Sequence, residues 1–180
     1  REIYVQSMLS TRRDDIDGAI LQAKNLEAAG CRILRLAVPD IDSVNTVYAL
    51  KKNIGMPIVA DIHFDYKLAL ECVAAGVDKI RINPGNIGND EKVHAVARAC
   101  STAGVPIRIG VNGGSLEKNI LAKYGGPTEK ALVESALYHV SLLEKFDFDD
   151  IVISIKSSDV KTMINAYRSL ASLCDYPLHL

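Results

Sequence analysis

The sequence predicts an α/β fold in which a parallel β-sheet is covered by α-helices. Short apolar segments typical of strands alternate with longer amphipathic segments typical of helices, and this pair recurs six times along the 180 residues. The helical segments start near Asp or Ser and several stop at glycine, as at Gly30 and Gly76. Hydrophobic residues make up 48% of the chain and charged residues 24%, so the chain can bury a sizeable core.

The expected elements follow one another in strict alternation. Strands are predicted over residues 3–8, 33–38, 56–63, 78–83, 106–112, 150–156 and 177–180. Helices are predicted over residues 14–29, 42–54, 66–75, 89–103, 128–145 and 159–173. A long loop rich in glycine, residues 113–127, is expected between the fifth strand and its helix.

Two arrangements of such units fit this order, a doubly wound open sheet and a (β/α)8 barrel. A complete barrel usually needs about 250 residues, whereas this chain has 180 and stops inside its seventh strand. We therefore predict a TIM (β/α)8 barrel that is truncated after the start of strand seven. Residues 1–180 would form one partial barrel domain that binds substrate.

Composition predicts neither a nucleic-acid partner nor a membrane partner. The formal net charge is -1, which gives no electrostatic reason to bind a polyanionic polymer or an anionic lipid surface. The sequence also has no apolar run that approaches the roughly 18 residues of a membrane-spanning helix.

The four cysteines are predicted to be buried thiols rather than metal ligands. They are Cys31, Cys72, Cys100 and Cys174, and no two of them form a C-x-x-C pair. Each lies in or close to a predicted helix. Small buried thiols are typical of proteins in a reducing compartment.

One face of each predicted strand carries polar side chains. Residues two apart share a face of a strand, and an ordinary buried parallel strand is apolar on both faces. Here the apolar positions alternate with polar ones and must meet the helices, so the polar face is expected to point into the barrel. We predict a substrate-binding site made of Arg35, Asp61, His63, Arg81, Asn83, Arg108, Asn112 and Lys156.

The charges of this set do not balance. Arg35, Arg81, Arg108 and Lys156 face the single carboxylate of Asp61. A buried ion destabilises the fold by several kcal/mol unless it is paired, and one carboxylate cannot pair four cations. The missing partner is predicted to be a polyanionic ligand, and the guanidinium groups favour phosphate.

The alternative is an ion-pair network that acidic residues elsewhere in the barrel complete. We favour the ligand, because most of the polar positions lie toward the C-terminal ends of their strands, where barrel enzymes carry their active sites. The loops 84–86 and 112–115 contain glycine directly after strand ends, which lets backbone N–H groups approach an anion.

The histidines are assigned from their positions. His63 shares a face with Asp61 and is predicted to contact substrate. His179, in the last segment, is left open between the site and the core. His94 and His139 lie on predicted helices and are expected to be packed or solvated.

Several strings of residues together resemble one known family. They are Val5-Gln6-Ser7-Met8, Ala60-Asp61-Ile62-His63-Phe64-Asp65-Tyr66, Lys79-Ile80-Arg81-Ile82-Asn83-Pro84-Gly85-Asn86-Ile87-Gly88, Arg108-Ile109-Gly110-Val111-Asn112, Ser154-Ile155-Lys156-Ser157-Ser158-Asp159-Val160 and Tyr176-Pro177-Leu178-His179-Leu180. In this order they resemble the 4-hydroxy-3-methylbut-2-enyl diphosphate synthase family over essentially the whole chain.

The resemblance implies an iron–sulfur oxidoreductase of isoprenoid biosynthesis by the methylerythritol phosphate route. Such enzymes reductively open and dehydrate 2-C-methyl-D-erythritol 2,4-cyclodiphosphate to 4-hydroxy-3-methylbut-2-enyl diphosphate. Electrons come from ferredoxin or flavodoxin through a [4Fe-4S] cluster, which a separate C-terminal domain holds on three Cys and a Glu. The family is homodimeric and cytoplasmic, or plastidial in plants and apicomplexans.

By the same resemblance, the predicted site residues other than Asp61 lie where the family contacts substrate. The cluster domain is absent from this chain, so the cluster ligands are not among its residues. The chain alone is therefore expected to bind diphosphates without turnover.

Two segments depart from the family pattern. Residues 9–13 read Leu-Ser-Thr-Arg-Arg where the family usually has Thr-Asn-Thr-Asp-Thr, and Gly113 stands where Ser is frequent. A pterin-binding synthase barrel is a second enzyme hypothesis, although that class expects an Asn-rich loop after the first strand. A non-catalytic sensor of a phosphorylated ligand on a barrel scaffold is a third.

Overall fold

The structure is a computed structural model that describes residues 2–180. Its six parallel strands are hydrogen-bonded in the order in which they occur in the chain. They are β1 (Gln6–Met8), β2 (Ile33–Ala37), β3 (Ile58–Asp61), β4 (Lys79–Ile82), β5 (Ile107–Asn112) and β6 (Ile151–Lys156). A doubly wound sheet would reverse its strand order at one point. The unbroken order therefore confirms the predicted barrel architecture.

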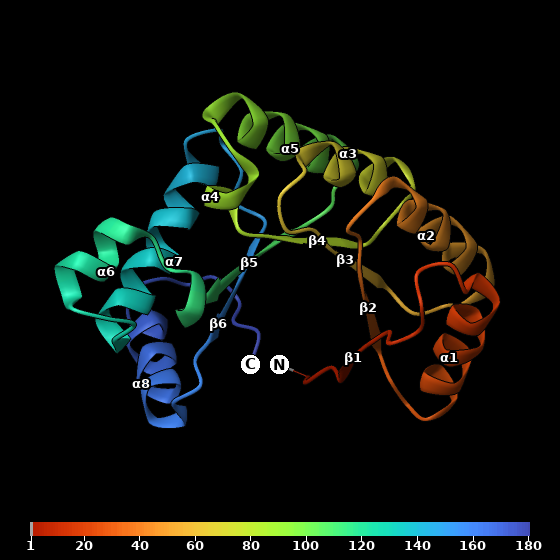
Figure 1. The fold of residues 1–180 in the computed structure, drawn as a ribbon, viewed down its shortest axis with the longest axis horizontal. Coiled ribbons are helices and arrows are strands. Elements are labelled where there is room, and N and C mark those ends of the chain that lie inside the picture. Colours follow the sequence, from red (N-terminus) through yellow and green to blue (C-terminus); the bar gives the residue numbers. More distant parts are fainter. Residues whose placement is uncertain (1) are drawn as a thin grey trace.

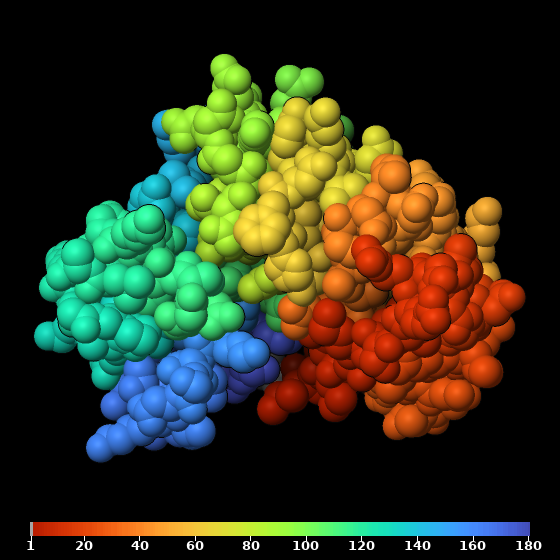
Figure 2. Space-filling view, in the orientation of Figure 1, coloured from red at the N-terminus to blue at the C-terminus, as the bar shows by residue number. Residues whose placement is uncertain are grey.

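The helices lie on the convex side of the curved sheet (Figure 1). They are α1 (Ile16–Ala28), α2 (Ile41–Asn53), α3 (Tyr66–Ala74), α4 (Pro84–Ile87), α5 (Asp90–Ala103), α6 (Lys118–Tyr124), α7 (Glu129–Glu144) and α8 (Val160–Ala171). The sequence colours run around the arc from red to blue (Figure 2), as expected when each strand–helix unit packs beside the next. Across residues 2–180, none of the helices combines the length and the apolar character needed to cross a membrane.

Helix starts follow from short acidic side chains. Asp15, Asp40 and Asp159 each accept a hydrogen bond from a backbone N–H three residues ahead, at 2.8–3.0 Å. Such caps satisfy donors that a first turn leaves without partners. At the other end of α5, Gly104 adopts a left-handed conformation with φ of 65°, where a side chain would be strained.

The alternation along the strands separates two environments. The large side chains Ile58, Ile80 and Ile107 are fully buried among the helix residues of one hydrophobic core. The side chains at the intervening positions lie on the concave face of the sheet. The register pairs Asp61 with Arg81 and Arg81 with Arg108, so polar residues of neighbouring strands stand at one level.

Three short elements lie inside segments predicted as loops. Helix α4 starts at Asn83-Pro84, where the Asn caps the helix and the Pro presets its first turn. Helix α6 and a 3-10 turn, η1 (Gly113–Ser115), lie inside the predicted loop 113–127. These elements are short and lie next to glycines, so their sequences show no recognisable hydrophobic period, which requires a longer segment. Strand β1 is shorter than the predicted 3–8, although the carbonyl of Val5 still accepts the N–H of Arg32 at 2.9 Å.

The predicted seventh strand is reduced to one parallel bridge between Leu178 and Ile153. The next rung of the ladder is occupied by the hydroxyl of Tyr167. That hydroxyl accepts the N–H of Ile155 at 2.8 Å and donates to the carbonyl of His179. The Tyr167 side chain takes the place of the next strand-to-strand hydrogen bond. The predicted parallel orientation of this segment is therefore correct, but the predicted strand length, residues 177–180, is wrong.

Candidate functional site

The concave face is organised by the carboxylate of Asp61, at the end of β3. Its side chain is 1% exposed, and it accepts hydrogen bonds from Nε of Arg35 at 3.1 Å and from Nη1 of Arg81 at 3.0 Å. A second nitrogen of Arg35 also contacts the same carboxylate. The three side chains come from three adjacent strands, and the parallel register brings them together. With Arg108 on β5 they form a group that we call the ion layer.

The arginines keep Asp61 ionised despite its burial. Burial alone would raise the pKa of the Asp61 carboxyl, but Arg81 and Arg35 together lower it below its ordinary value. Asp61 is therefore a carboxylate at neutral pH and balances only part of the positive charge of the ion layer.

Arg108 is the cation that this carboxylate does not pair. Its side chain is buried, and within residues 2–180 it makes no ion pair and its Nε has no hydrogen-bond partner. Burial, and then the neighbouring Arg35 and Arg81, lower the pKa of Arg108 to about 10. The group remains charged at neutral pH, so the fold holds a buried cation beside two others.

Two further residues of this face were not among the predicted site residues. Gly110 gives room to Arg81, because a Cβ at Gly110 would lie 2.2 Å from Nε of Arg81, and its carbonyl accepts Nη2 of Arg81 at 3.0 Å. Lys79 lies two residues before Arg81 on the same face, and burial and then Arg108 lower its pKa. A glycine inside a strand and the two-residue spacing were the signals that could have identified them.

His179 belongs to the same surroundings. Its pKa is lowered to about 4, first by burial and then by the charges of Arg108, Lys79 and Arg35. The imidazole is therefore neutral at physiological pH. This places His179, which the sequence left open, beside the ion layer.

The other predicted residues lie at the C-terminal ends of the strands. His63 is exposed, with Nε2 3.7 Å from Oδ1 of Asp61. Asn83 and Asn112 use their Oδ1 atoms to accept the N–H of Gly85 at 3.3 Å and of Gly114 at 3.1 Å. Each asparagine therefore keeps its Nδ2 donor for another partner.

Lys156 is exposed at the end of β6, where the register pairs it with Asn112. The predicted set therefore consists of the ion layer and of four residues at the strand ends, His63, Asn83, Asn112 and Lys156, which we call the rim. Of these four, His63 lies nearest the Asp61 carboxylate, at 3.7 Å.

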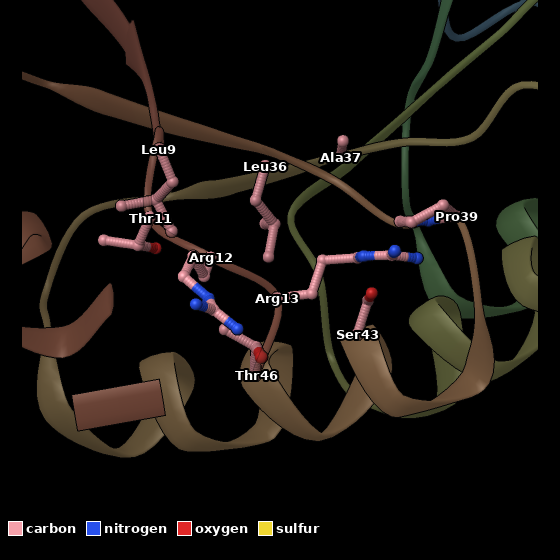
Figure 3. A pocket seen from close by; sticks show the side chains of 9 residues that line it. All are labelled: Leu9, Thr11, Arg12, Arg13, Leu36, Ala37, Pro39, Ser43 and Thr46. Carbon is pink, nitrogen blue, oxygen red and sulfur yellow. The ribbon is translucent and has the colours of Figure 1, made fainter. Parts of the chain in front are cut away.

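The segment that departs from the family pattern, residues 9–13, contributes Leu9, Thr11, Arg12 and Arg13 to the lining of a cavity of about 160 Å³ beside β2 and α2 (Figure 3). Arg12 pairs with Asp14 at 3.1 Å and Arg13 with Asp40 at 2.8 Å, both on the surface. None of the eight predicted site residues lines this cavity. It therefore lies apart from the ion layer.

The cysteines do not form a metal site. Cys31, Cys72 and Cys100 are buried and Cys174 is half-buried, all as free thiols. Burial raises the pKa values of Cys72 and Cys100 to about 12, which opposes the thiolate form that binds metal. Within residues 2–180, no group of three or more His, Cys, Asp or Glu side chains could hold a metal ion.

We expect Asp61→Asn to destabilise the protein by about 3–5 kcal/mol at pH 7, because it leaves Arg35 and Arg81 without their counter-charge. The native pKa of Asp61 is lowered, so its stabilisation is present above about pH 4 and is lost as the pH falls through the native pKa. The difference between wild type and variant should therefore shrink in acid. Urea denaturation at pH 7 and pH 3 measures both effects.

The exposed surface pair offers the control for this experiment. Asp14→Asn, which removes the partner of Arg12, should cost no more than about 1 kcal/mol at either pH. Equal losses for Asp61→Asn and Asp14→Asn would show that the ion layer does not contribute as described.

We expect Gly110→Ala to displace the Arg81 guanidinium and to cost about 1–3 kcal/mol through its lost hydrogen bonds. The cost should be smaller when Arg81 is already Met, because the added methyl then has room. Thermal denaturation of the two single variants and the double variant measures this coupling. Strict additivity would contradict the close approach of Arg81 to Gly110.

The chain matches the GcpE TIM-barrel domain family over residues 1–180. It is 56% identical over 179 residues to 4-hydroxy-3-methylbut-2-en-1-yl diphosphate synthase (flavodoxin) of Geobacillus thermodenitrificans, covering 99% of this chain and 48% of that protein. The corresponding protein of Fusobacterium nucleatum is 54% identical over 178 residues, covering 99% and 50%. The chain spans about half the length of these curated relatives.

Solved structures show the same fold at low sequence identity. Dihydropteroate synthase of Yersinia pestis superposes with a TM-score of 0.65 at 16% identity, over 94% of this chain and 64% of that one. A phospho-2-dehydro-3-deoxyheptonate aldolase of Thermotoga maritima gives 0.68 at 12% identity, over 97% and 50%. These likenesses concern the barrel alone, whereas the match over all 180 residues shows that the chain belongs to the GcpE family and corresponds to its TIM-barrel domain.

Proposed function

We propose that this chain is the substrate-binding barrel of a 4-hydroxy-3-methylbut-2-en-1-yl diphosphate synthase. In this function the concave face binds the diphosphate of 2-C-methyl-D-erythritol 2,4-cyclodiphosphate for reductive ring opening and dehydration. The names of the Geobacillus and Fusobacterium relatives support the activity. The charge of the concave face supports the substrate class.

The unpaired guanidinium of Arg108 is the observation that carries the proposal. Within residues 2–180 this buried cation has no partner, which by itself destabilises a fold, and an anionic ligand on the concave face would supply the counter-charge. A diphosphate supplies several oxygens at once to groups that come from β2, β4 and β5. Guanidinium groups suit this ligand, because their planar N–H donors can bind two phosphate oxygens together.

The rim residues would complete the binding. The Nδ2 donors of Asn83 and Asn112 and the ammonium of Lys156 lie at strand ends beyond the ion layer and can donate to the outer oxygens or to the carbon portion's hydroxyl groups. When the ring opens, negative charge builds up on the leaving diphosphate oxygen. Fixed donors at that oxygen would stabilise the transition state more than the bound substrate.

The cluster chemistry belongs to a part of the protein that this chain does not contain. A [4Fe-4S] cluster would deliver the two electrons, but the four scattered cysteines of this chain do not fit one, so we assign no step to them. We propose that a C-terminal domain supplies the cluster and that the complete protein is a cytoplasmic homodimer. The name of the relatives favours flavodoxin as the electron donor. The chain by itself would bind the substrate without turning it over.

Two other hypotheses compete with this proposal, a pterin-binding synthase and a non-catalytic sensor of a phosphorylated ligand. The likeness to dihydropteroate synthases is a likeness of fold at 16% identity and does not favour a pterin ligand. A sensor would bind the same anion as the enzyme, so binding alone does not separate these two. Turnover of the cyclic diphosphate by a longer chain that carries the cluster domain would distinguish the enzyme from the sensor.

We expect Arg108→Met to weaken binding of the cyclic diphosphate by at least about tenfold, because a charge-assisted hydrogen bond contributes about 1.5–3 kcal/mol. Without ligand, the variant should be as stable as wild type or more stable by up to about 2 kcal/mol, since the unpaired buried charge is gone. Isothermal titration calorimetry and urea denaturation measure the two quantities.

Arg98→Met is the matched control, because Arg98 is exposed on the outer helix α5. It should leave both affinity and stability unchanged. Wild-type protein that is folded by circular dichroism and yet binds no cyclic diphosphate would contradict the proposed function. A strong loss of stability in Arg108→Met would instead assign Arg108 a structural role.

A further inference from the structure

His139, on α7, is a buried histidine that contacts two strand-end loops. Its side chain is 0% exposed. The Nδ1 atom lies 3.3 Å from the backbone N of Gly85, in the short helix α4 that follows β4, and Nε2 lies 2.6 Å from Oε1 of Glu117, in the connection after β5. One imidazole therefore bridges the two loops that follow adjacent strands of the concave face.

The contacts define the protonation state of the ring. The N–H of Gly85 points at Nδ1, so Nδ1 carries no proton and the proton of the neutral ring lies on Nε2. Nε2 is 2.6 Å from Oε1 of Glu117, but within residues 2–180 the geometry of this contact is not that of a hydrogen bond. Burial lowers the pKa of His139, although Glu117 opposes this effect. A neutral ring is thus compatible with both contacts, whereas an imidazolium would direct two N–H donors at each other on the Gly85 side.

Gly85 fits this ring closely. A Cβ at Gly85 would lie 2.6 Å from Cε1 of His139. Gly85 does not have a positive φ, so its backbone conformation does not itself require glycine. The ring of His139 is what excludes a side chain there.

The bridged loops carry two residues of the proposed substrate rim. The N–H that faces His139 also lies 3.3 Å from Oδ1 of Asn83, so the histidine and the asparagine amide share one donor. Glu117 follows the 3-10 turn that starts after Asn112. The ring therefore contacts the backbone N–H that Asn83 accepts, and it also contacts the side chain of Glu117, three residues after the N–H of Gly114 that Asn112 accepts.

Packing alone does not account for this arrangement. Oε2 of Glu117 is buried and has no partner within residues 2–180, and a buried unsatisfied carboxylate oxygen destabilises a fold. An apolar residue at position 139 would fill the space without burying a carboxylate. Local arrangements that oppose stability tend to be retained where they position functional groups.

We propose that His139 is a positioning residue for the diphosphate site, which holds the turn at Gly85 and the segment at Glu117 in one fixed relation. This inference rests on the proposed function, because the held loops carry Asn83 and Asn112. His139 itself does not touch the substrate. It acts by fixing the directions in which the two asparagines donate.

The test combines a ligand-free measurement with a binding measurement on the same chain. Nitrogen-15 NMR of the histidine ring should show Nδ1 without a proton and Nε2 with one. Calorimetry with inorganic pyrophosphate should show a loss of affinity of about tenfold for His139→Leu. His139→Asn, whose amide oxygen can replace Nδ1 as the acceptor for Gly85, should recover most of that loss. His94→Leu, an exposed histidine on α5, is the control and should bind as wild type does.

The outcomes distinguish a failure of the positioning role from a failure of the proposed function. A folded His139→Leu protein that binds pyrophosphate as tightly as wild type overturns the positioning role while the proposed function stands. A protonated Nδ1 in wild type also overturns it. If His139→Leu does not fold, Glu117→Ala decides, since it cuts one contact and leaves the ring in place: unchanged affinity overturns the role, and a several-fold loss supports it. Wild type that binds no pyrophosphate overturns both the proposed function and this inference.

Discussion

The ion pairs of Asp61 with Arg35 and Arg81 are the interaction on which the concave face depends. They take two guanidinium groups from β2 and β4 and hold them against one carboxylate that is almost wholly buried. That carboxylate pairs with these two guanidinium groups and not with Arg108 on β5, which makes no ion pair within residues 2–180. The same pairing that stabilises the sheet therefore leaves a positive site that an anionic ligand can neutralise.

The parallel register explains why this site is local. Neighbouring strands in one barrel place equivalent positions at the same level, so Asp61, Arg81 and Arg108 meet although they are 20 or more residues apart in the chain. The segments that follow these strands also come together, because the buried ring of His139 contacts Gly85 after β4 and Glu117 after β5. The ion pairs thus lie at one height along the strands, and the hydrogen bonds of Asn83 and Asn112 lie in the segments that follow the strand ends.

Sequence reasoning recovered the parts of the molecule that follow from periodicity. The alternation of Arg81 with Ile80 and Ile82 indicated which face is polar, and the repeated strand–helix order indicated the barrel. It missed what depends on contacts between distant residues. No spacing shows that Gly110 gives room to Arg81, that Tyr167 interrupts the seventh strand, or that His139 lies against Gly85. It also missed α4 and α6, which are too short and too rich in flanking glycine to produce a helical period.

We propose that the unpaired charge of the ion layer is the binding site of a diphosphate. A crystal structure of this chain grown with 2-C-methyl-D-erythritol 2,4-cyclodiphosphate tests it most directly. We expect diphosphate oxygens within hydrogen-bond distance, about 2.7–3.1 Å, of the Arg108 guanidinium, with the asparagine amides of the rim directed toward the ligand. Diphosphate bound away from the concave face, with Arg108 still lacking an anionic partner, would contradict it.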